Sequence, residues 1–93
     1  MGDYKRFVNK DKFWEIYYHT DTNELLIRKG IIGQDGIFEI QTGFDGLEWG
    51  SIYNNKIDEY SKNWSINQPI LTEDQFVELR FRLYDYEGNL IQD

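Results

Sequence analysis

The stretch "IRKGIIGQDGIFEI" (27–40) carries a glycine at every third position, at Gly30, Gly33 and Gly36. A phosphate-binding loop needs a helix directly after its glycines, so that backbone N–H groups point at the phosphate. Here the next residues are IFEIQ, in which apolar and polar side chains alternate as they do in a strand. The Asp-Gly pair at 35–36 also favours a tight turn, because such residues accept positive φ. The stretch therefore predicts a turn that joins two neighbouring strands.

Strands are predicted on both sides of this turn. Residues 13–19 and 25–31 are rich in aromatic, leucine and isoleucine side chains, and this composition favours strands. "DTNE" at 21–24 lies between them, and its first three side chains favour a turn by bonding to their own backbone. Residues 37–43 form the third predicted strand. Together these segments predict an antiparallel meander.

The hydrophobic period changes after this third strand. Large apolar side chains then recur at helical spacing and form one stripe: Trp49, Tyr53, Ile57, Tyr60 and Trp64. Asp45 followed three residues later by Glu48 resembles a capping box. We therefore predict a helix at 46–62 whose stripe lies across the sheet.

The C-terminal segment gives two conflicting signals. Thr72 with Gln75 three positions later fits the start of a helix. Apolar and polar residues then alternate over 77–84, which favours a strand with one apolar face, and "YEGN" at 86–89 predicts a turn into a short strand at 90–92. The expected fold is a single α+β domain, 1–93. Its antiparallel sheet consists of the meander plus C-terminal strands and is packed by one amphipathic helix.

The chain is acidic, with 17 Asp and Glu against 10 Lys and Arg and a net charge of −7. The balance is uneven, because residues 1–29 hold six basic and five acidic side chains whereas 30–93 hold four and twelve. This distribution disfavours general nucleic-acid binding and favours a partner with a basic surface.

Composition also bears on compartment. The absence of cysteine excludes disulfides and thiolate metal sites and fits a reducing compartment. No run of about 18 apolar residues predicts a membrane helix, and the first residues lack the apolar run of a secretory signal. We expect a cytoplasmic protein without membrane association.

Residue types that carry catalysis are sparse. His19 is the one histidine, so no multi-histidine metal site is predicted, and no serine lies in a nucleophile motif. "DTNE" resembles the start of a calcium loop but lacks the glycine at the sixth place and the acid at the twelfth. We predict no catalytic residue, no metal site and no cofactor, and therefore not an enzyme.

Basic residues near the N-terminus are the first candidate contacts: Lys5, Arg6, Lys10, Lys12, Arg28 and Lys29. When the first two predicted strands pair, Lys12 and Lys29 lie toward the same end of the hairpin. Such a patch suits phosphate contacts, whereas scattered cations on a sheet also discourage edge pairing. Both interpretations stay open.

Three segments resemble a WGR domain, the small module of DNA-dependent poly(ADP-ribose) polymerases and of bacterial proteins. "NKDKFWEI" is similar to its opening strand, "RKGIIGQDG" to its glycine-containing signature, and "KIDEYSKNW" to the end of its helix. The likeness covers about residues 7–64, and the signature triplet falls at Lys29, Gly30 and Ile31, where the glycine is kept. The resemblance implies a sheet with one helix and a binding role.

We therefore predict a non-enzymatic, WGR-like interaction module that docks on a macromolecular partner, with a protein favoured. The candidate contacts lie on the hairpin and on the helix: Lys12, Arg28, Lys29, Asp45, Glu48, Asp58 and Glu59. One alternative is an acidic inhibitor, of the kind encoded by phages or mobile elements, that imitates DNA charge in the basic cleft of a nucleic-acid enzyme. The other is weak nucleic-acid binding through the basic hairpin.

Overall fold

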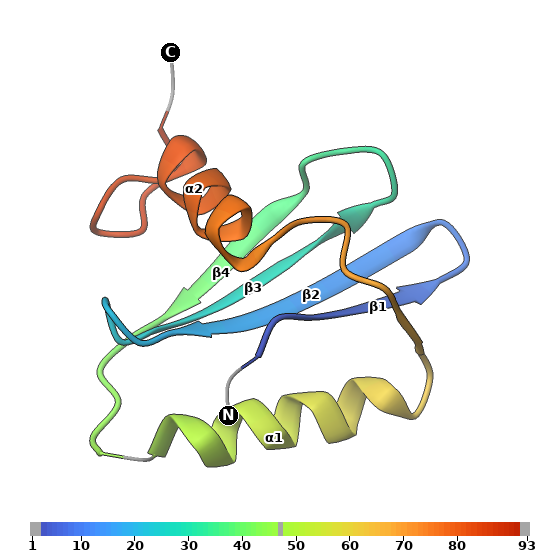
Figure 1. Ribbon diagram of the computed structural model, residues 1–93, viewed down its shortest axis with the longest axis horizontal. Coiled ribbons are helices and arrows are strands. Elements are labelled where there is room, and N and C mark those ends of the chain that lie inside the picture. The colour runs from blue at the N-terminus through green and yellow to red at the C-terminus, as the bar shows by residue number, and fades with distance from the viewer. Residues whose placement is uncertain (1–2, 47, 92–93) are drawn as a thin grey trace.

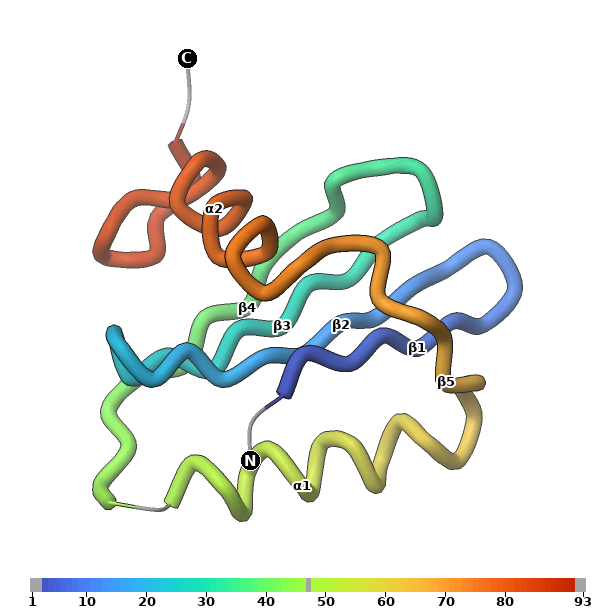
Figure 2. The backbone as a smooth tube through the Cα atoms, viewed as in Figure 1, coloured from blue at the N-terminus to red at the C-terminus, as the bar shows by residue number. Residues whose placement is uncertain are grey.

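The computed structural model describes residues 3–46 and 48–91. Within them the chain forms a five-stranded antiparallel sheet, in the order β4-β3-β2-β1-β5, and two helices (Figures 1 and 2). The elements in chain order are β1 (Lys5–Asn9), β2 (Lys12–His19), β3 (Glu24–Ile31), β4 (Ile37–Gln41), α1 (Glu48–Ser61), β5 (Ser65–Asn67) and α2 (Glu73–Leu83). Helices α1 and α2 cover opposite faces, so the sheet is the middle layer (Figure 1). The α+β class is confirmed.

The predicted meander of β2, β3 and β4 is confirmed. Lys12 lies opposite Ile31 at one end of the β2–β3 ladder, and a short turn then leads into β4. Gly33 and Gly36 have φ angles of +96° and +71°, in the left-handed region that favours glycine. A Cβ at Gly36 would lie 2.5 Å from the Lys29 carbonyl oxygen. The glycines therefore shape a tight turn, and a strand follows them.

Helix α1 packs on the sheet through the predicted stripe. Tyr53 is buried, and Trp49, Ile57, Tyr60 and Trp64 are partly buried against the same cluster. The rings of Trp49 and Tyr18 stack with centroids 3.9 Å apart. This stripe attaches the whole length of α1 to one face of the sheet.

The start of α1 agrees in part with the predicted cap. Glu48 Oε2 accepts a hydrogen bond from the Asp45 N–H at 3.4 Å, which is one half of a capping box. The helix begins at Glu48, and the predicted helical residue Leu47 lies outside the described residues.

The strand predicted near the C-terminus is wrong, because this segment forms α2. The cap that competed with the strand prediction is present. The Thr72 hydroxyl accepts from the Gln75 N–H at 3.1 Å, and Gln75 Oε1 accepts from the Thr72 N–H at 2.9 Å. The helix buries Phe76, Leu79 and Arg80, which are spaced as one helical face.

The burial of Arg80 explains why the alternating pattern predicts a strand here. Its fully buried guanidinium donates from Nε and Nη2 to the two carboxylate oxygens of Glu24, at 3.1 and 2.9 Å. A side chain counted as polar therefore belongs to the packed face of the helix. The predicted turn after α2 is present, but the strand expected beyond it is a single bridge at Leu90, and Gln92 lies outside the described residues.

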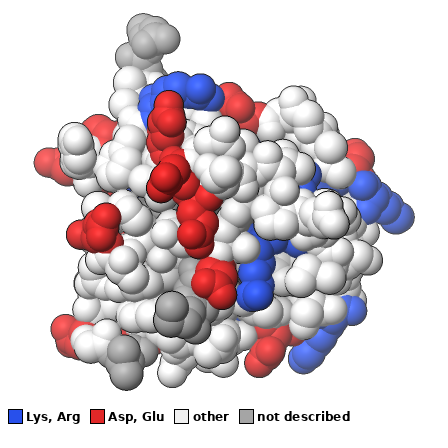
Figure 3. Space-filling view, in the orientation of Figure 1, with Lys and Arg blue, Asp and Glu red and all other residues white. Residues whose placement is uncertain are grey.

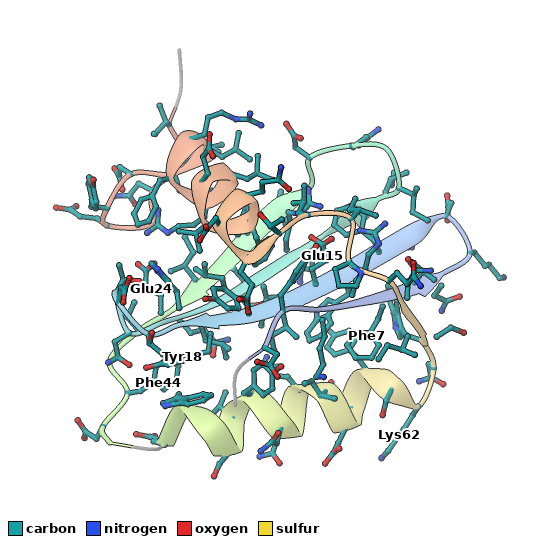
Figure 4. The ribbon with its side chains drawn as sticks, viewed as in Figure 1. Phe7, Glu15, Tyr18, Glu24, Phe44 and Lys62 are labelled. Carbon is teal, nitrogen blue, oxygen red and sulfur yellow. The ribbon has the colours of Figure 1, made fainter. Side chains whose placement is uncertain are left out.

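Strands β1 and β5 extend the meander beyond the prediction. β1 pairs with β2 on one side and with β5 on the other, and β5 leads the chain from α1 around the sheet edge toward α2 (Figure 2). Alternation along the strands sorts side chains onto two faces. Phe7 and Tyr18 point toward α1, whereas Glu15 lies on the α2 side (Figure 4). The two faces of the sheet therefore differ in chemistry.

Candidate binding groove at the glycine hairpin

A groove of about 480 Å³ lies at the β3–β4 hairpin, next to the end of α1. We call it the hairpin groove, and its principal lining side chains are Lys12, Trp14, Lys29, Ile31, Ile37, Tyr60 and Trp64. Strand register explains why they meet. Lys12 lies opposite Ile31, and Lys29 lies between Trp14 on β2 and Ile37 on β4. Directly opposite residues share a face of the sheet, so these five side chains converge.

The wall of the groove consists of three aromatic rings in contact. The rings of Trp14 and Tyr60 stack with centroids 4.1 Å apart, and Trp64 meets Tyr60 edge-on at 5.9 Å. The backbone N–H of Trp64 also donates to the backbone carbonyl of Tyr60, at 3.1 Å, just after α1 ends. Stacked rings held by a helix end form a rigid apolar surface.

The rim of the groove carries apolar side chains in contact with water. Ile37 is 59% exposed and Ile31 is 46% exposed. Lys12 and Lys29 are also exposed, and no carboxylate stands among the described lining residues. An exposed apolar surface with a charged rim is typical of sites that bind another molecule.

The predicted hairpin contacts divide between the two faces. Lys12 and Lys29 lie at the same end of the hairpin, as expected, and both border the groove. Arg28, the third predicted hairpin contact, does not border the groove. Arg28 adjoins Lys29 in β3, so its side chain points to the opposite face, where it is buried against Glu15.

The four predicted acidic contacts are exposed but do not border the groove. Asp45 and Glu48 lie at the start of α1, and Asp58 and Glu59 lie in its last turn. They therefore form two separate groups, one at each end of the helix.

Several groove residues were not singled out from the sequence. Tyr60 and Trp64 were assigned to the packing stripe, and Ile31 and Ile37 to strands. The sequence shows that the stripe continues beyond the predicted helix and that isoleucines flank the turn, but neither pattern brings the two groups together. The positions of these groups relative to one another depend on the docking of α1.

A second cavity, of about 470 Å³, lies on the α2 side of the sheet, beneath the β3–β4 turn and the start of α2. We call it the arginine cavity, because Arg6 and Arg28 line it together with Phe13. Both guanidinium groups lie against the Phe13 ring, with their Cζ atoms 5.0 and 4.6 Å from its centroid. Cation–π contacts of this kind hold the two arginines in place.

Glu15 organises the base of this cavity from a fully buried position. Its Oε2 accepts from the Tyr4 hydroxyl at 2.6 Å and from Arg6 Nη1 at 2.7 Å, and its Oε1 accepts from Arg28 Nε at 2.6 Å. Burial and the bond to Glu15 raise the pKa of Tyr4, so its phenol stays a donor. This cluster was not predicted, although a lone acid within "FWEIYY" hints at a buried partner.

Within residues 3–46 and 48–91, no group of three or more His, Asp or Glu side chains is placed to hold a metal ion. No helix in the same part of the chain has the length and apolar character needed to cross a membrane. Comparison of the chain with protein-family models, curated proteins and solved structures gave no match. The resemblance to WGR domains therefore stays a prediction.

Proposed function

We propose that the protein is a non-enzymatic interaction module that docks on a protein partner through the hairpin groove. The observation that carries this proposal is the uncovered apolar groove with Lys12 and Lys29 on its rim. The WGR-like features of the sequence lie in the same hairpin and helix end, and they support a binding role.

The chemistry of the lining supports binding rather than catalysis. Its ionisable groups are two lysines and Tyr60, and the described lining offers neither a carboxylate nor an imidazole to pair with them. Acid–base or nucleophilic catalysis needs such a second group within hydrogen-bond reach. A rigid aromatic wall needs no partner group to bind an apolar side chain.

The occupant that fits is a peptide segment with one large apolar side chain and an acidic residue beside it. The apolar side chain would lie against Trp14, Tyr60 and Trp64, and its burial contributes about 1.5–3 kcal/mol. A carboxylate near Lys12 or Lys29 adds about 0.2–1 kcal/mol for each exposed pair. The apolar contact therefore supplies most of the affinity, and the lysines orient the segment.

Selection of a displayed library of random peptides on the folded protein tests the proposal. We expect enrichment of sequences that combine an aromatic or branched apolar residue with Asp or Glu. Ile37→Asp should weaken a selected peptide about tenfold or more, because it removes apolar contact and repels the acid. Ile70→Asp is the matched control, since Ile70 is 63% exposed and lines the other cavity. Equal binding to both variants contradicts the proposal.

The lysines are tested separately with the selected peptide. Lys12→Ala and Lys29→Ala should each weaken binding a few-fold at low salt and less at high salt, because exposed charge pairs are screened. An effect that does not depend on salt would show that the rim charges do not pair with the peptide.

The acidic-inhibitor alternative has an observation of its own. Acidic side chains form a row over α2 (Figure 3), and Glu73, Asp74 and Glu78 of that helix are exposed. A row of carboxylates suits a basic cleft. If a panel of nucleases and polymerases includes an inhibited enzyme, the triple change Glu73→Gln, Asp74→Asn and Glu78→Gln should relieve inhibition, whereas Ile37→Asp should not.

Direct nucleic-acid binding would have to use the same hairpin with fewer cations. Burial of Arg28 leaves Lys12 and Lys29 as the exposed pair of the three predicted contacts. Two phosphate contacts give a salt slope of only about −2 on duplex DNA. A salt titration with duplex DNA separates this alternative from peptide binding.

A further inference from the structure

The base of the arginine cavity has more positive than negative charge. Arg6 and Arg28 are both buried, and among residues 3–46 and 48–91 Glu15 is the one carboxylate that bonds to them, from behind the cavity. The three side chains together carry a charge of +1. Buried charge that is not balanced is costly, so the site favours one further anion.

Arg6 shows where that anion would bind. Its Nη1 donates to Glu15, but its buried Nε has no hydrogen-bond partner among the described residues. Buried polar groups without a partner are rare in folded proteins, and each calls for an explanation. Arg6 lines the cavity, so an anion bound there contacts its guanidinium and offers Nε an acceptor once the side chain adjusts to expose it.

We propose that the arginine cavity binds a carboxylate group carried on an apolar body. The carboxylate binds between Arg6 and Arg28, where planar guanidinium groups match its two oxygens. One carboxylate brings the buried charge to zero. This site is separate from the hairpin groove and does not depend on its proposed function.

The outer part of the cavity favours a carboxylate over a phosphate. Asp35 and Glu78 line it and are exposed, and Arg82 Nη2 lies 3.9 Å from Asp35 Oδ2. With two acids near the entrance and Glu15 behind the base, a dianion meets more repulsion than a monoanion does.

The walls supply contacts for an apolar body. Leu71 and Leu79 line the cavity from the α2 side, and Phe13 lies against both guanidinium groups. Ile70 is exposed and lines the cavity too. The volume of about 470 Å³ suits a small organic molecule.

Benzoate is the probe, and the ¹⁵N-labelled full chain is observed by NMR. We expect a saturable shift of the Arg6 Nε–Hε resonance with benzoate, weaker binding of acetate, and no shift with benzyl alcohol, which has no charge. Inorganic phosphate should bind more weakly than benzoate. An unchanged Arg6 resonance means that water alone completes the site, and that result overturns the proposal, as does tighter binding of phosphate.

Ile70→Asp tests the cavity in a variant that should still fold, because it changes an exposed residue. It should weaken benzoate about tenfold by placing a third acid beside the entrance, whereas Ile37→Asp should leave benzoate binding unchanged. Equal loss in both variants overturns the assignment. These two variants have the opposite effects on the groove peptide, so failure of one proposal is distinguishable from failure of the other.

Arg6→Gln removes the guanidinium group whose Nε lacks a hydrogen-bond partner among the described residues. Benzoate should raise the melting temperature of the wild-type protein and not that of Arg6→Gln. A free organic acid and a peptide C-terminus carry the same group, so N-acetylphenylalanine is compared with benzoate. Tighter binding of benzoate indicates a free acid, and tighter binding of N-acetylphenylalanine indicates a peptide C-terminus.

Discussion

Replacement of Glu15 by glutamine keeps a buried side chain nearly the same size but removes the negative charge between Arg6 and Arg28. The carboxylate accepts three hydrogen bonds of 2.6–2.7 Å, from Tyr4, Arg6 and Arg28. An amide accepts on one side only, and its NH₂ group faces a donor on the other. Glu15→Gln therefore loses at least one charge-assisted bond and leaves two buried cations without an anion.

The expected cost is about 3–5 kcal/mol, the usual penalty for removing one partner of a buried ion pair. A domain of 93 residues has a free energy of unfolding of about 5–14 kcal/mol, so the variant loses roughly a fifth or more of its stability. Arg28→Gln should cost less than Glu15→Gln. It leaves Arg6 and Glu15 as a neutral pair, although the bond from Arg28 Nη1 to the Asp35 carbonyl is also lost.

Urea unfolding followed by tryptophan fluorescence measures the change. Glu39→Gln is the control, because Glu39 is exposed on β4 and its loss should shift stability by less than about 0.5 kcal/mol. The reasoning is refuted if Glu15→Gln unfolds at the same urea concentration as this control. It is also refuted if Arg28→Gln proves the more damaging change.

Four further substitutions test the fold. Arg80→Ala removes the bidentate partner of buried Glu24 and should cost about 3–5 kcal/mol in the same urea assay. Gly36→Ala and Gly43→Ala both place alanine at positive φ, at a cost of about 1–2 kcal/mol each. Of these two positions, only Gly36 would bring its Cβ to 2.5 Å from a carbonyl oxygen. Gly36→Ala should therefore lose more stability than Gly43→Ala. Burial raises the pKa of Tyr53 above its ordinary value of 10.0. The unfolded state therefore ionises first, and stability falls as the pH rises above about 10; Tyr53→Phe should make that fall shallower in alkaline denaturation.

Exposed neighbours control for these changes. Arg82→Ala should be nearly neutral, because its side chain is 66% exposed. Tyr86→Phe should leave the alkaline fall unchanged, since Tyr86 is exposed. A large effect of either control would mean that burial does not set the outcome.

The features that sequence reasoning predicted correctly all depend on short-range patterns. The turn at Gly33 and Gly36, the meander and the stripe of α1 each follow from residues a few positions apart. The features it missed depend on distant partners. The alternating pattern predicts a strand at α2 because Arg80 counts as a polar residue. Glu24, whose carboxylate makes the burial of Arg80 possible, lies 56 positions away.

The candidate groove shows the same division. Lys12 and Lys29 were expected at one end of the hairpin because strand pairing follows from the turn. Alternation alone also places Arg28 on the opposite face from Lys29. No local pattern could show that Tyr60 and Trp64 would complete the groove, because their position depends on where α1 docks.

Phe13 connects the two candidate sites and accounts in part for the glycine at position 36. It lines both the groove and the arginine cavity. A Cβ at Gly36 would lie 3.0 Å from Phe13 Cζ, and one at Gly30 would lie 2.8 Å from the Gly36 Cα. A side chain at Gly36 would therefore press on the ring against which both arginines pack, whereas one at Gly30 would collide with the Gly36 backbone. In this structure Gly30 and Gly36 allow the hairpin backbone to pack closely beside Phe13, whose ring lines both the apolar groove and the cationic cavity.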